Sequence, residues 1–118
     1  MSNTPTKSPI ALVINHEGMG QTDPPLQQKL IHVYLRLLDE GGTLPATICF
    51  HADGVKLIVE GSPVLEQLKT LEARGVMLLV CQTCLDYFNL RDKIRVGIVG
   101  SMPDIIVAQW HAQKVITF

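Results

Sequence analysis

The sequence predicts an α/β domain, a three-layer α/β/α sandwich around a mainly parallel sheet of about five strands. Three short apolar runs, 10–14, 46–50 and 76–80, lack the polar alternation of half-exposed strands, so both of their faces should be covered. Stretches of helical periodicity separate the runs, which indicates two βαβ units with right-handed crossovers. Because 118 residues suffice for one core, we expect a flexible tail at 1–8 and a single domain at 9–118.

The first helix should follow the first strand, beginning at Pro24 and Pro25 after Asp23 and ending before Gly41. Proline is favoured in the first turn of a helix, and glycine is favoured just beyond its end. An apolar stripe at helical spacing is expected to face the core. Its members are Leu26, Leu30, Val33, Leu37 and Leu38.

The second helix is predicted between the second and third strands. Ser62 can cap it, Pro63 can open it, and Gly75 can end it. Its core stripe consists of Leu65, Leu68 and Leu71. Ahead of it, residues 54–60 alternate like a strand but are too short and too closely bounded by glycines to assign.

The last third of the chain should complete the sheet. Residues 95–99 are predicted to form a fourth strand, and residues 114–118 a short fifth strand. Between them Pro103 should open a helix that runs through Ile106 to Trp110, with Trp110 in the core.

Composition argues against several classes of function. Ten basic and eleven acidic residues leave a formal charge of -1, with no basic cluster for nucleic acid. No apolar run approaches the length of a membrane span, and the polar N-terminus does not resemble a signal peptide. We therefore expect a cytoplasmic protein with no nucleic-acid or membrane partner, whose three cysteines are reduced.

The junction after the third strand holds a C-x-x-C motif at a predicted helix start. Thr83 and Asp86 fit a capping box, which would make Thr83 the N-cap and leave Cys81 exposed in the loop ahead of the helix. Backbone N–H groups and the helix dipole there would favour thiolate over thiol. Cys81 is therefore the predicted nucleophile, and Cys84 is its resolving or supporting partner.

Polar side chains also follow the first two strands. His16 and Glu17 come after the first, and His51 and Asp53 after the second. In a parallel sheet these positions share one edge with the third junction, where ligands collect. We expect these four residues and Thr83 to line a pocket at the thiol.

A C-x-x-C motif by itself leaves other interpretations open, including half of a zinc site, a redox pair and two passive thiols. Zinc needs four ligands, and the sequence has no second C-x-x-C and no H-x₃₋₅-H. We expect neither a metal nor a cofactor. Cys49 lies within a buried strand and is predicted to be an inert core residue.

Two segments resemble the DsrE/DsrF-like family. The run GVKLIVEGSPVLEQLKTLEARGV at 54–76 and the run CQTCLDYFNLRDKIRVG at 81–97 are similar to the C-terminal DsrE-like domain of YedF proteins. The ending AQWHAQKVITF at 108–118 resembles that of YchN. Gln82 and Asn89 stand where YedF-type chains usually have glycine, and asparagine tolerates the left-handed conformation that the second position needs.

The resemblance implies a protein that carries sulfane sulfur as a persulfide on Cys81, between separate donor and acceptor proteins. It also implies a homotrimer or homohexamer, with Cys84 matching the second thiol of the YedF and YchN pattern. Whether such a carrier catalyses a reaction stays open. The alternative is a non-catalytic oligomeric binding module in which both thiols are passive.

Overall fold

The computed structural model describes residues 6–118 and shows one five-stranded sheet in the order β4-β3-β2-β1-β5. Every neighbouring pair of strands runs parallel, as the apolar runs predict. The strands are β1 (Thr6–Ile14), β2 (Thr43–Phe50), β3 (Met77–Cys81), β4 (Ile98–Gly100) and β5 (Lys114–Thr117).

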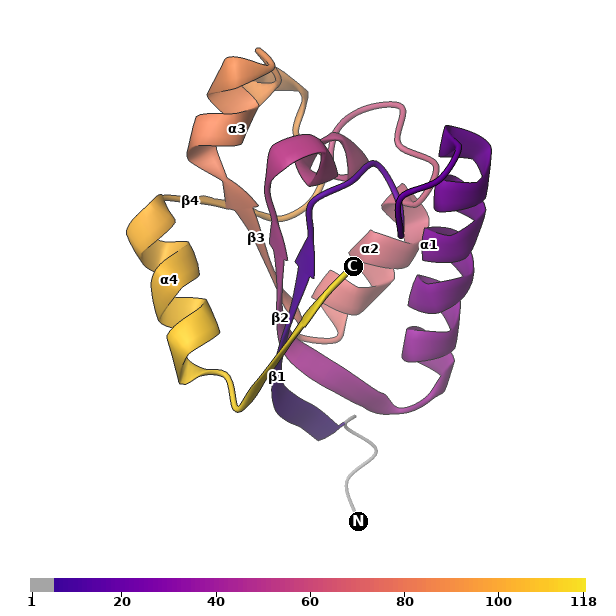
Figure 1. Cartoon of the computed structure of the whole chain (residues 1–118). Helices are drawn as coiled ribbons and strands as arrows, with labels where there is room; N and C mark the ends of the chain where they lie inside the picture. The colour runs from indigo at the N-terminus through magenta and orange to yellow at the C-terminus, as the bar shows by residue number, and fades with distance from the viewer. Residues whose placement is uncertain (1–5) are drawn as a thin grey trace.

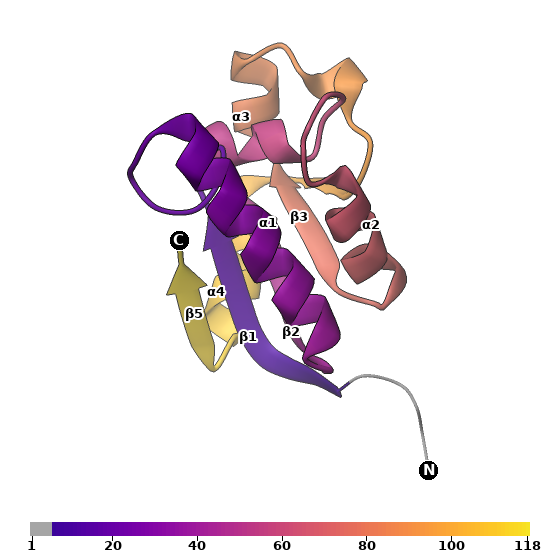
Figure 2. The same ribbon diagram turned by 90° about the vertical axis from the view of Figure 1, so that its right-hand side faces the viewer.

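Helices cover both faces of the sheet, which confirms the three-layer architecture (Figure 1). α1 (Pro24–Glu40) and α2 (Leu65–Ala73) pack side by side on one face, and α4 (Met102–His111) lies on the other (Figure 2). The short helix α3 (Gln82–Tyr87) and the 3₁₀ helices η1 (Ala52–Leu57) and η2 (Arg91–Lys93) lie beyond the carboxyl ends of the strands. Within 6–118, no helix has the length and apolar character that a bilayer crossing requires.

The first strand begins at Thr6, four residues ahead of the apolar run that predicts it. Pro9 has no backbone N–H, and the register between β1 and β2 shifts between Ser8 and Ala11. Pairing continues on the N-terminal side of this irregularity, where Thr6 is the partner of Thr43. Part of the predicted tail therefore belongs to the strand, and residues 1–5 lie outside the described residues.

The predicted core stripe of α1 is largely wrong. Leu26 and Leu37 are 46% and 52% exposed, whereas Ile31 and Leu35 are the fully buried residues of this helix. Periodicity establishes that the segment is helical, but apolar residues lie on more than one of its faces. Packing against the sheet and α2 selects the face of Ile31 and Leu35.

The second helix starts later than predicted. Leu65 is its first residue, and Pro63 lies ahead of it. The Ser62 hydroxyl does not cap the helix but accepts a hydrogen bond from the Val64 N–H at 3.2 Å, two residues along the chain. This local turn competes with the cap that the sequence predicts. The predicted burial of Leu68 and Leu71 is confirmed.

The prediction that Trp110 is a core residue is wrong, because its side chain is 84% exposed. Among residues 6–118, α4 alone covers its face of the sheet, and Ile105 is its one buried side chain. No other element in this part of the chain lies outside α4 to cover Trp110. The helix begins at Met102 after Ser101, whose N–H and hydroxyl both donate to the Asp104 carboxylate at 2.8 and 2.9 Å.

The segment left unassigned from sequence, 54–60, overlaps η1, which closes the core at the carboxyl edge of the sheet. Val55 and Leu57 are buried, so their apolar character reflects a packed 3₁₀ turn and not a strand. Gly54 allows the close approach, since a Cβ there would collide with the Ile14 carbonyl at the end of β1.

Candidate functional site

The candidate site lies where β1, β2 and β3 end side by side. Ile14 is the register partner of Phe50, and Phe50 is the partner of Val80. His51 follows Phe50 directly, and Cys81 follows Val80. The parallel sheet therefore brings the polar residues after these strands to one edge, as expected.

Cys81 is the last residue of β3 and is 1% exposed, so the prediction of an exposed loop thiol is wrong. The strand continues one residue further than the sequence indicates, and Cys81 pairs in register with Gly100 of β4. Helix α3 begins immediately afterwards, at Gln82, with Cys81 as its N-cap residue. Strand pairing on one side and the helix on the other leave no loop in which the thiol could be exposed.

Thr83 is not the N-cap of α3 but its second residue, with an exposed side chain. Asp86 does not reach back to Thr83; its carboxylate accepts two hydrogen bonds from the Arg91 guanidinium, at 3.0 and 2.9 Å. A charge-assisted bidentate pair competes successfully with a capping bond. The predicted capping box is therefore wrong.

Cys84 is partly exposed, and its Sγ accepts a hydrogen bond from the Ala52 backbone N–H at 3.1 Å. It is the third residue of α3, so it lies one helical turn from Cys81, the N-cap residue. Burial raises the pKa of Cys84, the Ala52 N–H opposes that effect, and the neighbouring Cys81 raises the pKa further. The expected lowering of the thiol pKa at this junction is therefore not found at Cys84.

Ala52 supplies that N–H from a rarely occupied backbone conformation. Its φ is 51°, in the left-handed region that non-glycine residues generally avoid. Neighbouring bonds hold the turn: the His51 N–H donates to the Ile14 carbonyl at 3.1 Å, and the Gly54 N–H donates to the His51 carbonyl at 3.0 Å. Strain of this kind is concentrated at functional sites, and here it orients a donor toward sulfur.

The two predicted histidines differ in their surroundings. His51 is half-buried, and burial lowers its pKa, so its imidazole is neutral at pH 7 and can accept a proton. His16 contacts the adjacent residue Asn15: its Nδ1 lies 2.8 Å from the Asn15 side-chain oxygen.

Glu17 and Asp53 converge on Lys56, a residue that the sequence analysis missed. The Lys56 Nζ lies 3.6 Å from the Glu17 carboxylate and 2.9 Å from the Asp53 carboxylate. The hydrogen bond that the Lys56 ammonium donates to Asp53 is the largest cause of the raised pKa of Lys56. The ammonium also lies 4.4 Å from the centre of the Phe88 ring. This contact connects η1 to the end of α3. The sequence did hold a signal for Lys56, since it is a basic residue three positions after Asp53 in an otherwise apolar segment.

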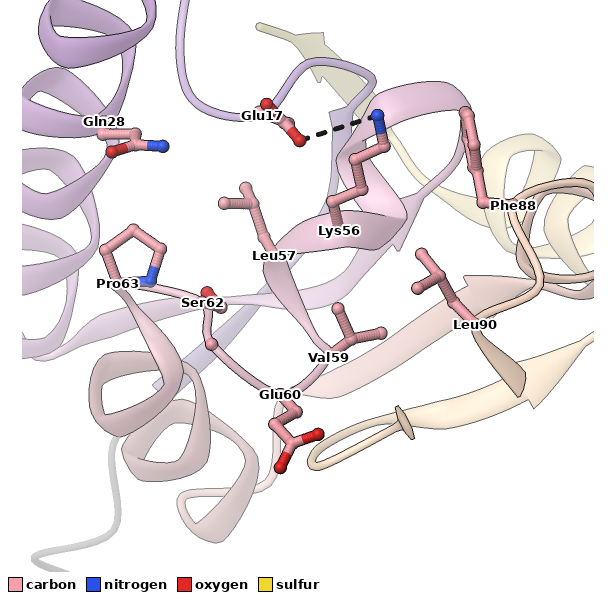
Figure 3. Close-up of a pocket in the computed structure, with 11 residues that line it drawn as sticks. Glu17, Gln28, Lys56, Leu57, Val59, Glu60, Ser62, Pro63, Phe88 and Leu90 are labelled. Carbon is pink, nitrogen blue, oxygen red and sulfur yellow. Dashed lines mark ion pairs between the residues drawn. The ribbon is translucent and has the colours of Figure 1, made fainter. Parts of the chain in front are cut away.

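A cavity of about 340 Å³ opens beside this cluster (Figure 3). Leu57, Val59 and Leu90 form apolar walls, and the ion pair of Glu17 with Lys56 lies at its rim. Of the five predicted pocket residues Glu17 lines this cavity, whereas His16, His51, Asp53 and Thr83 are not among its lining residues. The two thiols do not line it either. The cavity and the thiol pair nevertheless share η1 and the α3 segment.

Cys49 is the next-to-last residue of β2, has paired strands on both sides, is fully buried, and has its pKa raised to about 11 by burial. These properties are those of the inert core thiol that the sequence predicts. Among residues 6–118, no three side chains of the His, Cys, Asp or Glu type are grouped so that they could hold a metal ion.

Comparisons with known proteins agree with the fold. The sequence model described as the DsrE/DsrF-like family matches residues 10–118. No curated protein matches the chain. The YchN protein of E. coli superposes with a TM-score of 0.67 at 17% identity, over 96% of this chain and 99% of that one.

Two further solved structures are similar, both of proteins of unknown function. The one from Methanobacterium thermoautotrophicum has a TM-score of 0.68 at 16% identity, over 92% of this chain and 97% of that chain. The one from Bacteroides thetaiotaomicron has a TM-score of 0.64 at 15% identity, over 92% and 94%. At these identities the likeness is one of fold.

Proposed function

The chain belongs to the DsrE/DsrF-like family, and from that premise we propose that it is a sulfur-relay protein that carries sulfane sulfur as a persulfide on Cys81. The observation that carries the proposal is the placement of two cysteines, Cys81 and Cys84, one helical turn apart where β3 meets α3. A donor persulfide would give its outer sulfur to the chain and leave as a thiol, and an acceptor thiol would later remove that sulfur.

The surroundings of the thiol pair support this chemistry. Burial of Cys81 would keep a stored persulfide away from water and from competing thiols. His51, neutral at pH 7, would accept the proton that a thiol loses before it attacks a donor. Donor and acceptor would be proteins in the cytoplasm, where thiols stay reduced.

The test is intact mass measurement after incubation with a sulfane donor. The wild-type chain should gain one sulfur atom, and a Cys81→Ser variant should not hold it stably. Cys49→Ser is the matched control, because Cys49 is an equally buried cysteine without a second thiol, and this variant should load like wild type. Stable loading of Cys81→Ser to the wild-type level would remove Cys81 from the mechanism.

A non-catalytic oligomeric binding module is the second candidate, favoured by the burial of Cys81 and the raised pKa of Cys84. Both features slow the reactions of thiols with external reagents. In this case sulfane donors would leave the mass of the chain unchanged, and both thiols would react with alkylating agents only slowly at neutral pH.

Self-association as a homotrimer or homohexamer is part of the proposal. A cavity of about 540 Å³ lies along α4 and the β4 edge of the sheet, and Met77, Ile98 and Val107 at its walls are about half exposed. Apolar surface of this kind is typical of protein interfaces. Sedimentation of the wild-type chain should give a trimer or hexamer, and a monomer would contradict the assembly. The Ile98→Asp variant should shift toward monomer. The control variant Lys69→Asp, in the helical layer on the opposite face of the sheet, should keep the wild-type assembly.

A further inference from the structure

We propose that sulfur enters the chain on Cys84 and is then handed to Cys81, so that the two thiols act in sequence as an entry site and a storage site. This inference rests on the proposed carrier function and names the route within it. It follows from the different exposure of two cysteines that lie one helical turn apart.

Exposure decides which thiol a donor meets first. Thiolate attack on a persulfide requires the attacking sulfur to approach the outer sulfur of the donor directly. Cys81 is 1% exposed, between its strand partner in β4 and the start of α3, and offers a protein donor no such approach. Cys84 lies three residues further along, and its thiol is partly exposed. The donor therefore reaches Cys84 first.

The contacts of Cys84 suit an entry site. The Ala52 N–H donates to its Sγ at 3.1 Å, and such a donor stabilises the anionic sulfur that attacks and the one that later leaves. The positive φ of Ala52 holds this N–H in place. Cys81 is the N-cap residue and Cys84 the third residue of α3, so the first turn of the helix brings Cys81 within reach of sulfur bound to Cys84.

The transfer proceeds in two balanced steps. In the first, the Cys84 thiolate attacks the outer sulfur of the donor persulfide; a sulfur–sulfur bond forms on Cys84, the bond in the donor breaks, and the donor leaves as a thiolate. In the second, the Cys81 thiolate attacks the outer sulfur on Cys84, and the Cys84 thiolate leaves and takes up the proton that Cys81 has lost. No oxidant or reductant is consumed.

The site of the sulfur can be followed by rapid quenching, alkylation and peptide mapping with a small persulfide as the donor. In Cys81→Ser, sulfur should appear on Cys84 at the wild-type rate and be lost to added thiol. In Cys84→Ser, loading of Cys81 should be slower by at least about tenfold, because the buried thiol must wait for local opening. Unfolding Cys84→Ser in urea should abolish that delay.

The outcomes separate the two proposals. Failure of the wild type to take up sulfur overturns the carrier function itself. Loading of Cys84→Ser at the wild-type rate overturns the handover and leaves Cys81 as a direct carrier. Release of sulfide with formation of a Cys81–Cys84 disulfide from the Cys84 persulfide also overturns the handover, since Cys81 then attacks the inner sulfur and not the outer one. Each measurement is repeated with Cys81→Ala and Cys84→Ala, which replace the serine variants if those do not fold.

Discussion

The paired part of β2 around Cys49 and the carboxyl end of β3 around Cys81 each hold a buried cysteine, yet the two regions differ in how the cysteine is enclosed. Cys49 is 0% and Cys81 1% exposed. Cys49 lies in register between Val13 and Leu79, with paired strands on both sides. Cys81 lies one helical turn from the partly exposed Cys84. Burial alone therefore does not distinguish an inert thiol from a functional one.

The difference arises from strand pairing. Cys49 has a register partner in each neighbouring strand, whereas Cys81 has one only in β4, because the pairing of β3 with β2 ends at Val80. A residue paired on both sides is enclosed by neighbouring strands and by the helices above and below the sheet. A residue at the carboxyl end borders the loops and helix starts that gather there, so a second polar or reactive group can approach it. The predictions below compare these two regions.

Native alkylation should separate the two regions most strongly. With a pKa of about 11, Cys49 is only about 0.1% thiolate at pH 8, and it is also inaccessible, so Cys84 should react at least about 1000 times faster. Because the pKa of Cys84 is raised above 9.0, its rate should keep increasing with pH beyond 9, where an ordinary thiol levels off. Peptide mapping by mass measures each rate, and comparable rates for Cys49 and Cys84 would contradict the comparison.

Substitutions of Ala52 should test the strained turn that distinguishes the thiol region. Proline removes the N–H that contacts Cys84 and requires φ near −65°, so Ala52→Pro should lower the free energy of unfolding by about 3 kcal/mol or more. Ala52→Gly keeps the N–H and suits positive φ, and should change that free energy by no more than about 1 kcal/mol. Urea denaturation measures both; equal losses would show that the turn does not depend on backbone conformation.

Serine substitutions should reveal the opposite roles of the two regions. Cys49→Ser places a hydroxyl in a fully buried strand and should cost about 1–3 kcal/mol of stability without changing sulfur uptake. Cys84→Ser, at a partly exposed position, should cost less than about 1 kcal/mol but slow the uptake. A stable Cys49→Ser variant with impaired uptake would place Cys49 in the site.

The smallest effect concerns Thr83. Since it is not an N-cap, Thr83→Ala should change stability by less than about 0.5 kcal/mol. Ser101→Ala is the matched control, because Ser101 precedes α4 and its hydroxyl bonds Asp104, and its loss should cost about 1 kcal/mol. Thermal or urea unfolding measures the stability of both variants. A loss of stability in Thr83→Ala larger than about 0.5 kcal/mol would support the capping box that the sequence predicts.

The predictions from sequence differ in quality for physical reasons. Continuous apolar runs predicted the parallel sheet because only strands covered on both faces have that pattern. Asn89 was expected to tolerate a left-handed conformation, and its φ of 57° confirms this. The exposed stripe of α1 and the exposed Trp110 were mispredicted, because hydrophobicity does not reveal which face of a helix finds a partner.

At the candidate site, the neighbouring strand ends were predictable and the contacts across them were not. Glu17 and Asp53 were named, but Lys56, which joins them, lay in the unassigned segment. The bond from Ala52 to Cys84 links residues 32 positions apart in the chain. Such contacts depend on how η1 folds over the end of β3, which local patterns do not encode.

The amino-acid sequence by itself determined the order of strands and helices, the family, and the place of two cysteines where a strand meets a helix. These follow from local periodicity and motif spacing, which act over a few residues. Only the tertiary structure decided that Cys81 is buried, that Cys84 is the more accessible thiol, and that a strained backbone N–H points at it. Burial and long-range hydrogen bonds are set by neighbours distant in the chain, and the packed sheet is what brings those neighbours together.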